Sequence, residues 1–142
     1  MKKVLVLDFG GQYNLLVARR VRECGVYCEI KSFRMSMEEI RAFAPDALIF
    51  TGGPATVFEP NAPMVDKALL EMGIPVLGIC YGAQYISYAG GGKVEAADSR
   101  EYGRANLEHF DAENPLFKGF VENSQVWMSH GDKVKTPPPG FA

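Results

Sequence analysis

Apolar and polar positions alternate in blocks along the first ninety residues. Short runs rich in Val, Ile, Leu and Phe predict buried strands at residues 3–7, 26–31, 46–50 and 75–79. Helical spacing of apolar positions predicts helices at residues 12–24, 37–43, 62–72 and 82–89. Strands that alternate with helices indicate a parallel sheet with helices on both faces. The predicted fold class is therefore α/β, a doubly wound and mostly parallel sheet of the flavodoxin-like type.

Beyond Gly92 the pattern changes to strand-like runs separated by turns. These runs cover residues 93–95, 102–110 and 126–129, and they predict a small antiparallel extension of the fold. Three consecutive prolines at residues 137–139 cannot continue a helix or a central strand. We therefore expect the chain to stop in a loop.

Composition narrows the class of protein. The chain has 142 residues, 47% hydrophobic content and a formal net charge of -2, which suits one soluble globular domain. No cluster of Lys and Arg suggests a nucleic-acid partner, and no apolar segment is long enough to span a membrane. The opening residues 1–7 read as a first strand and not as a signal peptide.

Cysteine usage points to a reducing compartment. The three cysteines, Cys24, Cys28 and Cys80, form an odd set in a chain without a secretory signal. Cys24 and Cys28 have a spacing that could hold a metal, but a second pair of ligands is missing. We expect a cytoplasmic protein without a metal site.

The strongest candidate for chemistry is Cys80. It follows an apolar strand directly and has glycines two residues before and two residues after it, Gly78 and Gly82. Small residues at these positions allow a sharp strand-to-helix turn that presents the central side chain as a nucleophile. The N-terminus of the following helix favours thiolate over thiol. A small buried residue at a strand end is the plain alternative for a cysteine in this position.

Two further glycine-rich turns follow predicted strands, at residues 10–11 and 52–53. In open α/β sheets, ligands bind in the crevice beyond the carboxyl ends of the strands. We therefore expect these turns and Cys80 to form one site.

Four ordered motifs together resemble the class I glutamine amidotransferases. They are Asp8-Phe9-Gly10-Gly11-Gln12-Tyr13, Thr51-Gly52-Gly53-Pro54, Gly78-Ile79-Cys80-Tyr81-Gly82-Ala83-Gln84 and Trp127-Met128-Ser129-His130-Gly131-Asp132-Lys133-Val134. The resemblance extends over almost the whole chain, so residues 1–142 are expected to form a glutamine amidotransferase domain. It implies hydrolysis of glutamine to glutamate and ammonia through a cysteine thioester.

The resemblance also implies residue roles. Cys80 would be the nucleophile, and the backbone N–H groups of Gly53 and Tyr81 would form the oxyanion hole. The residues that match the family's substrate-binding positions are Gly52, Gln84, Ser129, His130, Gly131 and Asp132. A surface or packing role is the alternative for Gln84, and a plain turn is the alternative for Gly53.

The family's general base lies in a His-Pro-Glu segment, which this sequence does not contain. His109 falls in a strand-like run, and His130 with Asp132 mimics the spacing of a base and its orienting carboxylate. The resemblance places that pair in the glutamine-binding strip instead. We therefore expect the domain to be incomplete at its carboxyl end and weak or inactive alone, with an exposed core surface that would favour self-association.

The resemblance implies two partners, glutamine and an ATP-pyrophosphatase or synthetase part that uses the ammonia to aminate a purine nucleotide. It implies no cofactor in this domain, with ATP and Mg²⁺ used by the synthetase part. Two other hypotheses stay open: a glutamine-binding or regulatory module without turnover, and a different elbow-cysteine fold in which Cys80 is oxidised.

Overall fold

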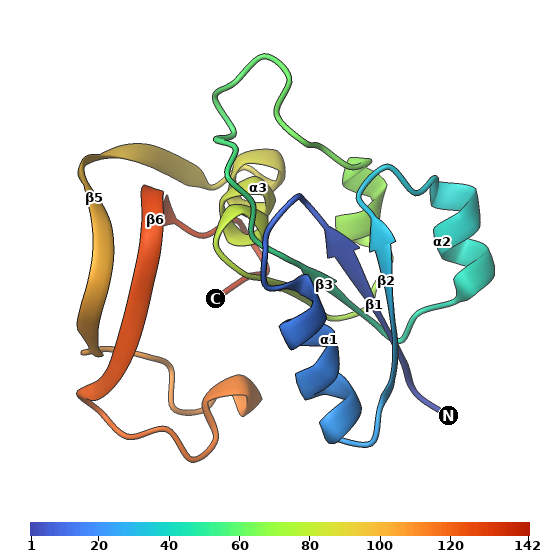
Figure 1. The fold of residues 1–142 in the computed structure, drawn as a ribbon, viewed down its shortest axis with the longest axis horizontal. Helices are drawn as coiled ribbons and strands as arrows, with labels where there is room; N and C mark the ends of the chain where they lie inside the picture. The colour runs from blue at the N-terminus through green and yellow to red at the C-terminus, as the bar shows by residue number, and fades with distance from the viewer.

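The chain forms a parallel sheet flanked by helices, with a two-stranded hairpin at one side (Figure 1). The computed structural model describes the backbone of residues 1–142 and the side chains of residues 1–96 and 102–142. The sheet has four parallel strands in the order β2-β1-β3-β4. Its strands are β1 (Lys3–Asp8), β2 (Tyr27–Ser32), β3 (Ala47–Phe50) and β4 (Val76–Gly78). The predicted doubly wound α/β class is confirmed.

Helices cover both faces of this sheet. They are α1 (Asn14–Glu23), α2 (Met37–Phe43), the 3-10 helix η1 (Lys67–Glu71) and α3 (Tyr81–Gly90). Successive side chains of a strand point to opposite faces, so β1 contributes to two apolar clusters. Val6 packs with Ala18 of α1, whereas Leu5 and Leu7 belong to a larger cluster with α2, η1 and α3. This larger cluster lies directly beneath the predicted nucleophile.

Helix α2 has the bounds that the sequence predicts, for a local reason. The Ser36 hydroxyl accepts a hydrogen bond from the Glu39 N–H at 3.2 Å, and the Glu39 carboxylate accepts one from the Ser36 N–H at 2.8 Å. This capping box satisfies two N–H groups that the first helical turn leaves unpaired. The helix ends at Ala44, which has a left-handed backbone conformation.

The predicted helix over residues 62–72 is wrong for its first half. Only Lys67–Glu71 is helical, as a 3-10 turn that begins where the Asp66 carboxylate accepts a hydrogen bond from the Ala68 N–H at 2.9 Å. Pro63 disfavours helical geometry in Ala62, the residue before it, and the Asp66 cap then sets the start of the helical turn. Residues 62–66 therefore run as an irregular connection.

The antiparallel extension is confirmed and is longer than its sequence pattern suggests. Strand β5 (Lys93–Leu107) pairs with β6 (Ser124–Thr136), and the short 3-10 helix η2 (Pro115–Phe117) lies in the connection between them. The sequence predicts His109 inside a strand over residues 102–110. Strand β5 ends at Leu107, so His109 lies in the connection that follows it. Figure 1 shows this hairpin beside α3, away from α1 and α2.

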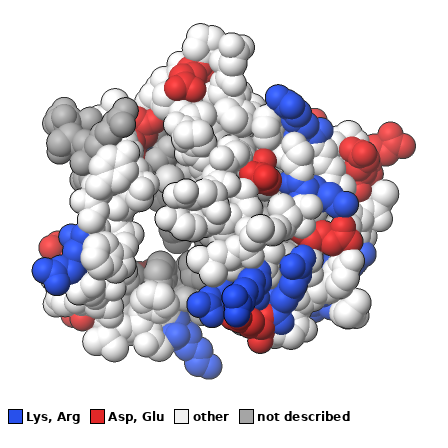
Figure 2. All heavy atoms as spheres, in the orientation of Figure 1, with Lys and Arg blue, Asp and Glu red and all other residues white. Residues whose placement is uncertain are grey.

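Charged side chains of both signs are interspersed over the sheet and helices on the face shown in Figure 2. Two of the arginines of α1, Arg19 and Arg20, pair with Glu23 at 3.0 and 2.7 Å. Both pairs are exposed, so water screens the charges and each pair contributes little to stability. Within the part of the chain that is described, no helix has both the length and the apolar character needed to cross a membrane.

Candidate active site

Cys80 occupies a sharp turn between β4 and α3, as the sequence predicts. Its backbone has φ 53° and ψ -113°, a conformation that residues with a side chain rarely adopt. Holding such a conformation costs on the order of 1–3 kcal/mol, and this kind of strain is concentrated at functional sites. The turn leaves the Cys80 side chain exposed to solvent.

The two glycines that flank Cys80 are required by close backbone packing. A Cβ atom on Gly78 would lie 2.6 Å from the Ala83 Cα, and one on Gly82 would lie 2.1 Å from the Phe50 carbonyl oxygen. Real Cβ atoms essentially never approach so closely. The steric reason given for the glycines from sequence therefore holds at both positions.

Cys80 is also the N-cap of α3. The Gln84 N–H donates to the Cys80 carbonyl at 3.1 Å, which begins the helical hydrogen-bond ladder. The positive end of the helix dipole therefore lies at Cys80, while the Gly82 N–H of the first turn donates to the Thr51 and Ile79 carbonyls. The Cys80 thiol donates to the Ser129 carbonyl of β6 at 3.6 Å, so the hairpin reaches the nucleophile.

The loop after β3 lies against the same cysteine. A Cβ atom placed on Gly52 would be 3.3 Å from the Cys80 Cβ and 3.8 Å from its Sγ. The next residue, Gly53, packs on the turn after β1, because a Cβ there would lie 2.3 Å from the Phe9 carbonyl oxygen. The structure thus places the Gly52 backbone beside Cys80 and packs the neighbouring Gly53 on the turn after β1, and the oxyanion-hole role of Gly53 stays a prediction.

Thr51 joins three loops at this site, and sequence reasoning assigned it no role. Its N–H and its hydroxyl donate to the Leu7 carbonyl at 3.2 and 3.0 Å, and its carbonyl accepts from the Gly82 N–H at 3.1 Å. Thr51 is 2% exposed, so these hydrogen bonds lie away from water. A hydroxyl residue directly after an apolar strand is the signal that could have identified it, because such side chains bond to nearby backbone groups.

The predicted glutamine-binding strip lies along β6, above the N-terminal part of α3. The Gln84 side-chain amide donates to the Asp132 carbonyl at 3.0 Å, and Gln84 is buried. Ser129, His130, Gly131 and Asp132 are consecutive residues of β6. Gln84 therefore ties the strip to the nucleophile helix, a packing role, and its part in substrate binding stays a prediction.

The described hydrogen bonds do not link His130 to Cys80. His130 Nδ1 lies 2.7 Å from the Asp132 backbone carbonyl oxygen, and the thiol of Cys80 bonds to the Ser129 carbonyl.

The other two cysteines lie in different environments. Cys24 is exposed at the end of α1, whereas Cys28 is buried in β2, and burial raises the pKa of the Cys28 thiol. Among residues 1–96 and 102–142, no three His, Cys, Asp or Glu side chains gather as a metal site would require.

The aromatic ring of Tyr81 is buried beneath the elbow, and its hydroxyl donates to the Pro63 carbonyl. Burial, with smaller effects from Tyr85 and Glu59, raises the pKa of Tyr81 to about 12. Tyr81 therefore ionises near pH 10 in the unfolded chain but only near pH 12 in the folded one. The unfolding free energy is at its full value below pH 10 and falls as the pH rises toward 12.

Replacing Tyr81 should change this alkaline loss of stability. We expect Tyr81→Phe to reduce the fall in unfolding free energy between about pH 10 and pH 12, the window set by the two pKa values. Urea unfolding across this window measures it, with Tyr88→Phe, a half-exposed tyrosine of the same helix, as control. An unchanged slope in Tyr81→Phe would show that Tyr81 does not titrate as described.

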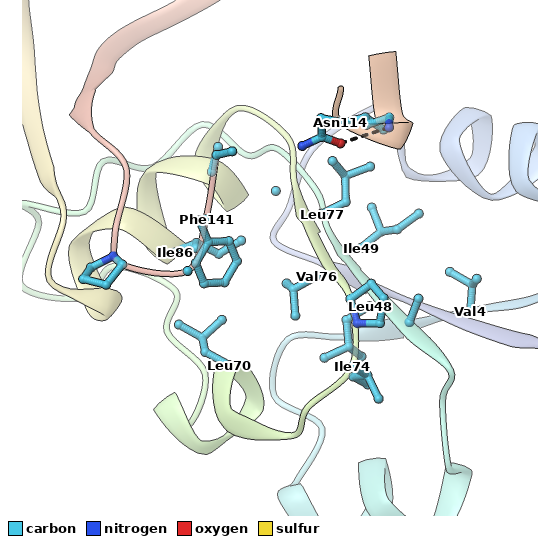
Figure 3. A pocket seen from close by; sticks show the side chains of 18 residues that line it. Val4, Leu48, Ile49, Leu70, Ile74, Val76, Leu77, Ile86, Asn114 and Phe141 are labelled. Atoms are coloured by element: carbon cyan, nitrogen blue, oxygen red, sulfur yellow. Dashed lines mark hydrogen bonds between the residues drawn. The ribbon is translucent and has the colours of Figure 1, made fainter. Parts of the chain in front are cut away.

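A pocket of about 720 Å³ lies elsewhere, along β4 and the end of the chain (Figure 3). Its lining is mainly apolar and includes Val76, Leu77, Ile86 and Phe141. None of the lining residues is one of the predicted site residues, so this pocket is separate from the candidate active site around Cys80.

Comparison with known proteins defines the class. Residues 5–142 match the family model described as "Glutamine amidotransferase class-I". The chain belongs to the class I glutamine amidotransferase family, as its motifs indicate.

The hexapeptide Asp8–Tyr13 and the run Ser129–Val134 also resemble the glutaminase domain of GMP synthase. Similar curated proteins carry that name. The chain is 56% identical over 138 residues to "GMP synthase [glutamine-hydrolyzing]" of Caldicellulosiruptor saccharolyticus, which covers 97% of this chain and 27% of that protein. It is 54% identical over 139 residues to the protein of the same name from Brachyspira hyodysenteriae. This match covers 98% of this chain and 27% of that protein. The chain thus spans about a quarter of the length of these relatives.

Solved structures support the fold. A Thermoplasma acidophilum protein described as a subunit of GMP synthase superposes with a TM-score of 0.86 at 31% identity, covering 100% of this chain and 71% of that one. A glutamine amidotransferase from Thermotoga maritima superposes with a TM-score of 0.72 at 22% identity. The match covers 96% of this chain and 63% of that one.

Proposed function

We propose that this chain is the glutaminase part of a GMP synthase and that it hydrolyses glutamine to glutamate and ammonia. The observation that carries this proposal is Cys80, an exposed thiol in a strained elbow at a helix N-terminus, with Gly52 of the glycine loop against it. A nucleophile, a positive helix end and a glycine loop at one point are the parts that acyl transfer requires.

The reaction begins when the Cys80 thiolate attacks the side-chain amide carbon of glutamine. The carbonyl oxygen becomes an oxyanion, which accepts hydrogen bonds from the N–H groups of Gly53 and Tyr81. The C–N bond then breaks, and ammonia leaves after its nitrogen gains a proton, so that a thioester on Cys80 remains. Water adds to this thioester through a second oxyanion, releasing glutamate and restoring the thiolate.

Glutamine lies along β6 in this proposal. Gln84 and the Ser129–Asp132 backbone provide donors and acceptors for the charged ends of the amino acid, and Gly52 leaves space beside the sulfur. The contact between Gln84 and the Asp132 carbonyl keeps this strip at a fixed distance from α3. Binding energy can then hold the amide in line with Cys80.

The family's general base lies in a His-Pro-Glu segment, which these 142 residues do not contain. His130 Nδ1 lies on a backbone carbonyl, and the Cys80 thiol lies on another. We therefore assign the base to a His-Pro-Glu segment of the family's kind, outside these 142 residues. His130 belongs to the glutamine-binding strip in this assignment.

The ammonia would serve a synthetase domain or partner protein that uses ATP and Mg²⁺ to convert XMP to GMP. Two observations support this partner: the relatives at 56% and 54% identity are named GMP synthase, and about three quarters of each relative lies outside the match. In this proposal, the glutaminase domain carries no cofactor of its own.

Ammonia release from glutamine tests the proposal. The chain alone is compared with a chimera in which it replaces the 138 matching residues of the Caldicellulosiruptor saccharolyticus GMP synthase. We expect turnover by the chimera and little or none by the chain alone, because only the chimera has the base. Equal turnover by both would make His130 the base, and glutamine binding without ammonia release by either would favour a binding module.

A further inference from the structure

The turn after β1 packs directly on the glycine loop of the site. A Cβ atom on Gly11 would lie 2.5 Å from the Gly52 carbonyl oxygen, and one on Gly53 would lie 2.3 Å from the Phe9 carbonyl oxygen. The two segments therefore touch through their backbones in two places. Any movement of the turn would be transmitted to the Gly52–Gly53 peptide.

Two polar side chains hold this turn at both ends. Asp8, the last residue of β1, accepts hydrogen bonds on Oδ1 from the Gly10 N–H at 2.7 Å and from the Asn14 side-chain amide. The same amide nitrogen of Asn14 donates to the Gly11 carbonyl at 2.9 Å. Asp8 and Asn14 thus form a clamp that fixes Gly10 and Gly11, and Gly11 is the residue that faces Gly52.

Asn14 is a polar residue at a buried position, where only its amide N–H groups have hydrogen-bond partners. It is the first residue of α1 and only 7% exposed, and its Oδ1 has no hydrogen-bond partner among the described residues. Burying an unpaired polar atom costs on the order of 1–3 kcal/mol. An apolar residue would avoid that cost, so the two bonds donated by Nδ2 are the evident compensation.

We propose that Asp8 and Asn14 are positioning residues that set the direction of the Gly53 N–H, an inference that rests on the proposed glutaminase function. Two consecutive glycines leave the Gly52–Gly53 peptide free to rotate. An oxyanion donor must lie about 2.7–3.1 Å from the developing charge. The clamped turn restricts that rotation from the side opposite Cys80.

The test uses the chimera with three substitutions. Asn14→Leu keeps the volume but removes both donors, and Asp8→Ala removes the shared acceptor. We expect each to lower kcat for ammonia release about 10- to 100-fold, as misplacement of a catalytic group does. KM for glutamine should stay within about threefold, because the clamp does not contact the β6 strip. Asp8→Asn keeps the acceptor oxygen and should retain most of kcat.

Alkylation of Cys80 by iodoacetamide separates positioning from general disruption. This displacement forms no oxyanion, so its rate should be unchanged in Asn14→Leu if only the Gly53 N–H has moved. Leu15→Ala, an exposed neighbour on α1, is the matched control and should leave kcat unchanged. Asn14→Ser gives the same comparison if the leucine variant fails to fold.

Two results would overturn the inference. One is an unchanged kcat in Asn14→Leu and Asp8→Ala. The other is a parallel loss of kcat, glutamine affinity, alkylation rate and melting temperature, which would make the clamp a general stability element. An inactive parent chimera would instead refute the proposed function.

Discussion

Replacing Cys80 with alanine should abolish glutamine turnover. In the chimera we expect Cys80→Ala to lower kcat for ammonia release by a factor on the order of 10⁵–10⁶, by comparison with removal of a serine nucleophile from a protease. The reason is that Ile79 and Cys80 are the two residues between β4 and α3, and of these only Cys80 carries a nucleophilic side chain. Glutamine binding should persist, because the groups that hold the amino acid belong to Gln84 and β6. Ammonia assays and calorimetric titration with glutamine measure the two effects separately.

Cys24→Ala is the matched control, since Cys24 is an exposed thiol at the end of α1. Its turnover should equal that of the parent chimera. Stability should also change little in Cys80→Ala, because the substitution removes only one weak hydrogen bond, the 3.6 Å contact with the Ser129 carbonyl. A Cys80→Ala protein that keeps a tenth or more of its turnover would contradict covalent catalysis by Cys80.

The largest effect on folding is expected from Gly82→Ala. The new methyl would lie 2.1 Å from the Phe50 carbonyl oxygen and 2.6 Å from its carbon, so α3 must move away from β3. That movement would also stretch the hydrogen bond from the Gly82 N–H to the Thr51 carbonyl. Overpacking costs about 1–3 kcal/mol and occasionally more, so we expect a loss of about 3 kcal/mol in unfolding free energy. Urea titration measures this loss.

Gly25→Ala separates this steric effect from backbone strain. Gly25 has φ +75° but nothing within 4 Å of its added Cβ, so only the conformational cost of about 1–2 kcal/mol applies. If Gly82→Ala destabilised the protein no more than Gly25→Ala does, the close approach of α3 to β3 would be wrong.

The strands and the elbow could be predicted from sequence because local pattern determines them. Apolar runs define β1 to β4, Ser36 and Glu39 define the start of α2, and the spacing Gly78-Ile79-Cys80-Tyr81-Gly82 defines the turn. These signals depend on residues a few positions apart. The glycine turn at residues 52–53 was predicted from its place after a strand, and the family resemblance added the expected role of Gly53 and the β6 strip.

Contacts between distant segments could not be read in this way. Thr51 bonds to Leu7 and Gly82, and Gly53 packs on Phe9, across separations of about thirty to forty-four residues. They follow from the pairing of β1 with β3 and of β3 with β4, which places three strand ends side by side. Pattern alone also overextended the helix at residues 62–72, where Pro63 overrides apolar spacing.

Labelling of this chain with a glutamine-derived chloromethyl ketone tests the central claim most directly. In this reaction the thiolate displaces chloride and forms a thioether, and peptide mass spectrometry locates the adduct. We expect modification at Cys80 in preference to the exposed Cys24, with protection by glutamine and none by asparagine. Equal labelling of Cys80 and Cys24, unaffected by glutamine, would contradict a glutamine site at the elbow.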